Sequence, residues 1–458
     1  MAALVDHSLL KQAEGADGES RFVMLETIRE YAQERLEASG EAEAARRRHA
    51  EYYLALAEKA EPQLVLANQG EWLERLTQMQ DNLRAALDWM IDRGELELAA
   101  RLSSALWRFL EASGDRLEGL RWLELVLDER YMLPTALRTK ALNAAGYLAI
   151  QVDEAMACGY FKQSITLARM FEDKQSLAFA LLGLAQSVDI PLVLAPLEES
   201  LALYRELDDR HGLAWVLGML GHIAISERDF TQAKACFAES LAHYHELGDT
   251  GGIAWTLSYI GFLDHICGDD TQAAAHFAES LALFQDIGEA RAIAWALHRV
   301  GEAAFWQGDG AQAVACHTES LTLYRTLGDE WGCGWALQGL GDVAIWQGDV
   351  GQAVTYFTES IAIYRNLNHQ PMIGVVLTGF VEIAVALGQA DRGARLASAI
   401  ATLMKAHLDP HDLAVYDQTV ALARAQLDEA TFDTAWAAGQ ALSLDEAIGE
   451  ALNERGQP

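Results

Sequence analysis

Apolar residues recur along this chain at helical spacing, in blocks of 40 positions that are separated by short polar turns. In the block 210–249, Leu217 and Leu220 fall on one face of a predicted helix. A polar turn at Asp229 follows, and a second apolar stripe that includes Phe237 begins soon after it. Each block therefore predicts a pair of antiparallel helices joined by a tight turn.

The 40-residue period is visible in individual residues between positions 199 and 398. Glutamate–serine pairs recur at Glu199/Ser200, Glu239/Ser240, Glu279/Ser280, Glu319/Ser320 and Glu359/Ser360. A tryptophan stands 15 positions after each of the first four serines, at Trp215, Trp255, Trp295 and Trp335. A fixed period of this size is typical of stacked repeats, in which no unit can bury its apolar face without its neighbours.

Glycine and aspartate mark the ends of the predicted helices. A Gly-Asp pair occupies the turn within three consecutive blocks, at Gly268-Asp269, Gly308-Asp309 and Gly348-Asp349. Glycine readily adopts the left-handed conformation that ends a helix, and aspartate is a favoured N-cap for the helix that follows. Near the C-terminus, Ser443 and Glu446 have the spacing of a capping box and predict the start of a last helix.

These patterns divide the chain into four segments. They are 1–50, with a predicted β-hairpin and helix; 51–198, with irregular helical repeats; 199–398, with five regular repeats; and 399–458, with capping helices. In the first segment, a small N-terminal β-hairpin is expected around the turn 15–18, followed by a helix over about 26–36. Pro191 and Pro196 predict a bend or an irregular loop before the regular repeats.

Composition narrows the classes of function. Of 458 residues, 51% are hydrophobic and only seven are proline, which suits a nearly all-helical chain with a continuous core. The net charge is −33, from 67 acidic and 34 basic residues, so we expect no nucleic-acid binding and no membrane contact. The sequence shows no secretory signal, no apolar run of about 18 residues and no paired cysteine spacing, and we therefore expect a cytoplasmic protein.

The repeat resembles the tetratricopeptide repeat. That family's signature is present as Leu217-x-x-Leu220-Gly221 in the first helix and as Ala233-x-x-x-Phe237 in the second. The block is longer than the family's about 34 residues, the closing proline is absent, and one block has histidine in place of the phenylalanine. The resemblance implies an all-α fold, a right-handed superhelical solenoid of helix-turn-helix units.

A second resemblance extends over most of the chain. The segments 4–10, 21–32, 46–53 and 81–86 are similar to the C-terminal part of bacterial STAND-type signalling ATPases, which include large LuxR-type transcriptional regulators. In those proteins a winged-helix segment joins a nucleotide-binding domain to a tetratricopeptide sensor. The resemblance implies that residues 1–50 are a winged-helix remnant and that the repeats form a sensor module.

Candidate binding residues lie on the first helix of each repeat, on a face separate from the leucine stripe. This face mixes aromatic with polar side chains, as ligand sites do, and by resemblance it lines the concave groove of a tetratricopeptide array. The candidates are Trp215, His222, Trp255, Trp295, His298, Glu302, Trp306, Trp335, Gln338, Asp342 and Trp346. The alternative is that the periodic tryptophans pack against the second helix of the preceding repeat.

No pattern in the sequence predicts catalysis, a cofactor or a metal site. His298 and Glu302 stand four positions apart, which is most often an exposed hydrogen-bonded pair on a helix. Cys316 and His317 lack a third orienting group and fall at a packing position. No Gly-Lys dipeptide occurs, so no P-loop is present. We predict a non-enzymatic sensor that binds a protein, a peptide or a small effector, with a free-standing adaptor protein as the alternative.

Overall fold

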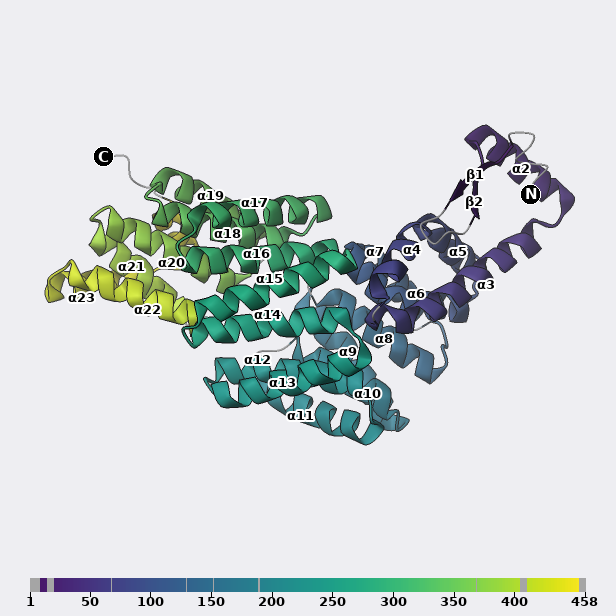
Figure 1. Cartoon of the computed structure of the whole chain (residues 1–458), viewed down its shortest axis with the longest axis horizontal. Helices are drawn as coiled ribbons and strands as arrows, with labels where there is room; N and C mark the ends of the chain where they lie inside the picture. Colours follow the sequence, from purple (N-terminus) through teal and green to yellow (C-terminus); the bar gives the residue numbers. More distant parts are fainter. Residues whose placement is uncertain are drawn as a thin grey trace. The chain divides into compact units, whose positions relative to one another are not determined.

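The described part of the chain is built almost wholly from α-helices. A computed structural model describes residues 9–14, 20–66, 68–128, 130–150, 152–187, 190–367, 369–403 and 410–452. Over these ranges consecutive helices pair into hairpins (Figure 1), and the predicted all-α solenoid of helix-turn-helix repeats is confirmed.

Each hairpin has a first and a second helix. The first helices are α6 (Leu96–Ser113), α8 (Thr135–Ala149), α10 (Lys174–Ala185), α12 (Arg210–Ser226), α14 (Thr250–Ile266), α16 (Ala290–Trp306), α18 (Glu330–Trp346) and α20 (Gln370–Ala386). The second helices are α7 (Arg116–Leu127), α9 (Glu154–Met170), α11 (Ile190–Leu207), α13 (Phe230–Leu247), α15 (Asp270–Ile287), α17 (Gly310–Leu327), α19 (Val350–Asn366) and α21 (Ala390–Leu403). Within unit 1 the first helix α8 contacts α6 and α10, and within unit 2 the first helix α18 contacts α16 and α20.

Shorter elements flank the hairpins. Near the N-terminus, β1 (Lys11–Glu14) pairs antiparallel with β2 (Ser20–Val23), and the turn predicted at 15–18 lies outside the described residues. The helices before the first hairpin are α2 (Glu26–Ser39), α3 (Ala42–Ala60), the 3-10 helix η1 (Glu61–Val65), α4 (Gln69–Thr77) and α5 (Gln80–Asp92). Those after the last hairpin are α22 (Pro410–Ala425), α23 (Glu429–Gln440) and α24 (Leu444–Ala451).

Internal contacts divide the chain into two compact units. Unit 1 comprises Met1–Met219, Glu239–Ile253 and Asp286–Glu289. Unit 2 comprises Leu220–Ala238, Ala254–Gln285 and Ala290–Pro458. The segment boundaries that the sequence predicts, at residues 50, 198 and 398, stay predictions.

The turns between paired helices have the predicted chemistry. Gly308 adopts a left-handed conformation with φ of 79°, which ends α16 without the steric cost of a Cβ atom. The Asp309 carboxylate then accepts a 3.0 Å hydrogen bond from the backbone N–H of Gln312 in the first turn of α17. Asp349 caps α19 in the same way through Gln352 at 3.0 Å. Both roles, helix stop and N-cap, are confirmed.

The serine of each Glu-Ser pair ties the second helix of a hairpin to the first. Its buried hydroxyl donates a hydrogen bond to a backbone carbonyl of the first helix. The bonds join Ser200 to Ala178 (2.8 Å), Ser240 to Ala214 (2.7 Å), Ser280 to Ala254 (2.8 Å), Ser320 to Ala294 (2.7 Å) and Ser360 to Gly334 (2.8 Å). The serine period therefore satisfies a buried hydroxyl in every repeat.

A glycine on the first helix makes room for an aromatic ring on the second. A Cβ atom at Gly341 would stand 2.3 Å from the ring of Phe357, and one at Gly221 would stand 2.6 Å from that of Phe237. Both phenylalanines are completely buried. Any side chain at these glycines would push the paired helices apart, which explains why small residues recur there.

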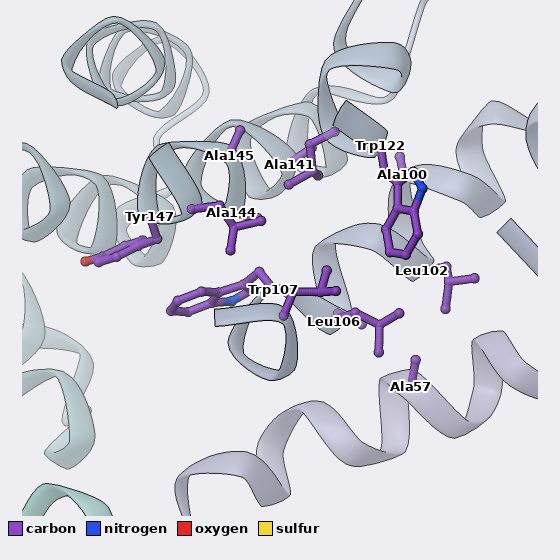
Figure 2. Packing of buried hydrophobic residues seen from close by; sticks show 14 of the residues in the cluster. Ala57, Ala100, Leu102, Leu106, Trp107, Trp122, Ala141, Ala144, Ala145 and Tyr147 are labelled. Carbon is purple, nitrogen blue, oxygen red and sulfur yellow. The ribbon is translucent and has the colours of Figure 1, made fainter. Parts of the chain in front are cut away.

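In unit 1 the hairpins share a continuous apolar core. Figure 2 shows residues of α3, α6, α7 and α8, including Ala57, Trp107, Trp122 and Tyr147, gathered in one packed region. Trp107 and Tyr147 are buried and stack, with ring centroids 5.0 Å apart and planes inclined by 27°. Stacking between first helices therefore begins upstream of the regular repeats.

Two expectations concern residues outside the regular turns. Ser443 and Glu446 form the predicted capping box at the start of α24. Of the bend or irregular loop expected around Pro191 and Pro196, the loop is wrong, because α11 runs continuously over Ile190–Leu207 with Pro196 inside it, and the bend stays a prediction. Pro191 falls in the first turn of that helix, where the backbone N–H groups have no partner within the helix, so its missing donor carries no cost there.

Candidate functional site

Tryptophans of three consecutive first helices form an aromatic column in unit 2. Trp255 of α14, Trp295 of α16 and Trp335 of α18 occupy the same repeat position, and each is partly buried. The ring centroids of Trp255 and Trp295 are 4.7 Å apart, and those of Trp295 and Trp335 are 6.3 Å apart. Trp331 adds a further ring 5.3 Å from Trp335. The indoles therefore contact one another along the first helices.

The alternative interpretation of these tryptophans predicts that they pack against the second helix of the preceding repeat. The described ring contact of Trp255 with a second helix is to Phe284 of α15, at 5.1 Å. That helix belongs to the same hairpin as Trp255, not to the preceding one. The remaining described ring partners of the column lie on first helices.

Trp215 belongs to a separate column in unit 1. Its ring lies 5.3 Å from Tyr147 of α8 and 6.0 Å from Phe179 of α10. The guanidinium carbon of Arg108 lies 4.3 Å from the ring centroid of Trp107 and 5.5 Å from that of Trp215. The sequence did not identify Trp107, Tyr147 or Arg108 as part of this column, because the segments before residue 199 do not keep the 40-residue spacing.

Arg299 occupies a place among the rings of the unit 2 column. Its guanidinium carbon lies 5.1 Å from the ring centroid of Trp295, 4.6 Å from that of Trp335 and 5.3 Å from that of Phe262. Its Nη1 atom donates a 2.8 Å hydrogen bond to Oε2 of Glu302. Aromatic faces together with a carboxylate are the groups that hold a guanidinium in cation–π sites. This face is therefore chemically suited to an arginine side chain.

Two histidines are buried beside the column. His298 and His317 are each 1% exposed, with ring centroids 4.7 Å apart, and His298 lies 4.0 Å from Trp335. Burial lowers the pKa of both imidazoles, that of His317 to about 3, so both are neutral near pH 7. The prediction that His298 and Glu302 form an exposed pair is therefore wrong. His298 Nε2 does lie 3.4 Å from Glu302 Oε1, but neighbouring rings cover the imidazole.

Three carboxyl groups occupy one repeat position on successive first helices. They are Glu302 of α16, Asp342 of α18 and Glu382 of α20, and all are partly buried. Burial, and then the nearby carboxyl of Glu382, raise the pKa of Asp342 well above its usual range, while a hydrogen bond with Gln338 opposes the shift. Burial also raises the pKa of Glu382. Arg299 neutralises Glu302. Among the described residues, no lysine or arginine nitrogen lies within 4.0 Å of the other two carboxyls.

The remaining candidates lie away from the column. Trp346 ends α18 and is 56% exposed. Trp306 ends α16, and its indole stacks on the imidazole of His265. His222 of α12 is exposed and lies 5.5 Å from the ring of Tyr259. Of these residues, Trp346 offers the most accessible aromatic surface.

The structure brings most of the predicted site residues of unit 2 together on the first-helix face. The members of this set, which we call the α16–α20 face, are Trp295, His298, Arg299, Glu302, Trp335, Gln338, Asp342 and Glu382. Sequence reasoning missed Arg299 and Glu382. Glu382 stands 40 positions after Asp342, so the period itself was the signal. Arg299 gave no signal, because the equivalent residues in neighbouring repeats are Tyr259 and Gly339.

The described residues show neither a metal site nor a membrane span. No group of three or more of their histidine, cysteine, aspartate and glutamate side chains is arranged to hold a metal ion. Their helices also lack the combination of length and apolar character that a bilayer crossing requires.

Sequence families match two parts of the chain. Residues 292–366 match the tetratricopeptide repeat, and residues 1–37 match a winged helix-turn-helix domain. Proteins from Mycobacterium bovis and Mycobacterium tuberculosis that are named as HTH-type transcriptional regulators are 30% identical to this chain over 228 residues. That alignment covers 47% of this chain and 26% of each regulator, so the chain spans about a quarter of the length of these relatives.

Similarity to solved structures extends over most of the chain. The Rap protein complexed with Competence and Sporulation Factor has a TM-score of 0.52 at 13% identity, over 82% of this chain and 98% of Rap. A STAND signal-transduction ATPase with a tetratricopeptide repeat sensor from Pyrococcus horikoshii has a TM-score of 0.46 at 12% identity, over 99% of this chain and 60% of that protein. The predicted resemblance to tetratricopeptide regulators with a winged-helix segment is confirmed. The absence of nucleic-acid binding stays a prediction.

Proposed function

We propose that this chain is a non-catalytic sensor module that binds a peptide segment of a partner protein on the first-helix face of unit 2. The aromatic column of Trp255, Trp295 and Trp335 is the observation that carries the proposal. These indoles keep part of their surface accessible, although each is large enough to be enclosed in a core. Aromatic side chains dominate the energetics of protein interfaces, because they bury a large area with few rotatable bonds.

The groups around the column suit a peptide. Ligand sites combine an apolar wall with a few polar groups that fix orientation. Here Glu302, Gln338 and Asp342 stand on the same helices as the indoles. A surface built from helices has no free sheet edge to which a peptide could add a strand. Side chains must therefore recognise the peptide.

Similar proteins indicate the kind of protein in which this module works. The chain matches part of the length of HTH-type transcriptional regulators and carries a segment similar to a winged helix-turn-helix domain. We therefore place it in the cytoplasm, as the sensor part of such a regulator. The Rap protein, whose fold is shared, was solved with Competence and Sporulation Factor bound, which supports ligand binding by a solenoid of this kind.

A peptide selection tests the proposal. A random peptide library is panned against the purified chain, and the affinity of the best peptide is measured for wild type, Trp335→Ala and Tyr356→Ala. Tyr356 is a matched control, because it is a partly buried aromatic residue on the second helix α19. We expect Trp335→Ala to weaken binding by about tenfold or more and Tyr356→Ala to change it by less than about twofold. Circular dichroism confirms that both variants are folded. Equal affinity of wild type and Trp335→Ala would overturn the proposal.

A further inference from the structure

The carboxyls of the α16–α20 face differ in whether the protein itself supplies a cationic partner. Glu302 is paired with Arg299, which stands three positions before it on α16. The positions three before Asp342 and Glu382 are Gly339 and Gly379. Packing explains these glycines, because a Cβ atom would meet the ring of His317 or Phe357. Asp342 and Glu382 therefore lack the arginine that Glu302 has three positions before it.

Buried acceptors of the same face, and one buried donor, the Nε atom of Arg299, have no hydrogen-bond partner among the described residues. His298 is 99% buried, its Nε2 atom faces Oε1 of Glu302 at 3.4 Å, and its Nδ1 atom has no hydrogen-bond partner among the described residues. A neutral imidazole keeps one ring nitrogen as an acceptor. The buried Oε1 atom of Gln338 likewise has no hydrogen-bond partner there. Unsatisfied buried acceptors beside carboxyl groups call for a ligand that is rich in N–H donors.

We propose that Asp342 and Glu382 bind the guanidinium of an arginine side chain that the partner peptide presents to α18 and α20. This inference rests on the proposed function and specifies the ligand of the same face. A guanidinium carries five N–H donors and a positive charge, so it would match both the acceptors and the carboxyls. Arg299 shows the arrangement within the protein, since its guanidinium lies 4.6 Å from the ring centroid of Trp335 and pairs with Glu302.

The charges around Asp342 and Glu382 fit this ligand. The charged groups that act on Asp342 are acidic: Glu382 of α20, Asp412 of α22 and Glu302 of α16, with Gln338 as a neutral hydrogen-bond partner. Glu382 accepts a 3.3 Å hydrogen bond from the hydroxyl of Thr419 on α22. Burial raises the pKa of both carboxyls, and the neighbouring acidic groups raise the pKa of Asp342 further, which favours the protonated forms. A bound cation would favour ionisation instead, so arginine binding should strengthen as pH rises and should release protons.

Two synthetic peptide libraries test the inference. Both are randomised in neutral residues, and they differ at one fixed central position, which is arginine in one library and the neutral isostere citrulline in the other. Their binding is measured by fluorescence polarisation to wild type, to the double variant Asp342→Asn/Glu382→Gln and to Glu359→Gln. Glu359 is the control, because it is an exposed glutamate on the second helix α19 of the same unit. The amide variants keep the shape of the protonated carboxyls, and thermal unfolding confirms that they are folded.

We expect wild type and Glu359→Gln to bind the arginine library about tenfold more tightly than the citrulline library, and the double variant to lose that preference. If the double variant keeps the preference, general attraction by the chain's net charge of −33 explains it and the inference is overturned. If wild type binds both libraries equally, the inference fails while the proposed function stands. If wild type binds neither library, both fail.

Discussion

The indole of Trp306 lies flat on the imidazole of His265, with ring centroids 3.4 Å apart and planes inclined by 10°. His265 is on α14 and Trp306 on α16, so the stack joins two successive first helices. The equivalent indole one repeat later, Trp346, is 56% exposed. Trp306 and Trp346 occupy equivalent repeat positions, yet Trp306 packs between helices whereas Trp346 is accessible to solvent.

Truncating these two indoles should have different effects on stability. Trp306→Ala removes the stack with His265 and leaves a gap between α14 and α16, whereas Trp346→Ala removes a mostly solvated ring. We expect Trp306→Ala to lower the free energy of unfolding by about 2 kcal/mol more than Trp346→Ala. Chemical denaturation of both variants measures the difference. Equal losses would show that the stack contributes nothing.

The hydrogen bond from Ser320 to the carbonyl of Ala294 predicts a smaller, local effect. Ser320→Ala removes a buried 2.7 Å bond between the helices of one hairpin and should cost about 1 kcal/mol. Ser226→Ala is the control, because its hydroxyl is exposed and lies 3.5 Å from a carbonyl of its own helix. Thermal unfolding should show a clear decrease for the first variant and almost no change for the second. A similar change in both would mean that the hairpin bond is not stabilising.

Two glycines on neighbouring helices should respond to alanine with opposite signs. In Gly341→Ala the added methyl group would stand 2.3 Å from the Phe357 ring, and such overpacking costs about 1–3 kcal/mol. In Gly351→Ala on α19 the nearest side-chain atom, Oδ1 of Asp349, is 3.7 Å away, so the better helix propensity of alanine should stabilise by about 1 kcal/mol. Denaturation midpoints of the two variants test this. A stabilising Gly341→Ala would contradict the packing described for the hairpins.

The buried His317 predicts a loss of stability in acid. Its pKa in the folded protein is about 3, whereas an unperturbed histidine titrates near 6.5. As pH falls from 6.5 toward 3, the unfolded chain takes up a proton that the folded chain does not, so folding becomes less favourable. His317→Phe, which has the residue of the other repeats at this position, should be about 3 kcal/mol more stable than wild type at pH 4 and close to it at pH 8. Parallel pH profiles of the two proteins would show this prediction to be wrong.

The sequence predicts the repeats well because their determinants are local. Asp309 caps α17 by accepting a hydrogen bond from the backbone N–H three residues further on. Gly308 ends α16 through its own left-handed backbone conformation alone. Pro196 shows the opposite case, since packing of a whole helix outweighs the preference of one residue. Local rules therefore predict the ends of most helices and fail where tertiary contacts decide.

The site is harder to predict, because its contacts cross between repeats. The spacing of His298 and Glu302 alone predicts an exposed pair, but Trp335, 37 positions later, covers His298. Arg299 likewise contacts the rings of Phe262 and Trp335, which are distant in the sequence. Asp342 can be predicted, because the period places it on the same helix face as Glu302. The period predicts which positions face the same way, and it does not predict which side chains meet there.

Photo-crosslinking tests the central claim, that the first helices of unit 2 bind the partner, most directly. A peptide selected from a random library carries a benzophenone side chain, and mass spectrometry identifies the residues to which it attaches after irradiation. Attachment should fall on α16, α18 and α20, near Trp335 and Gln338. Attachment confined to the second helices α15, α17 and α19 would contradict the claim.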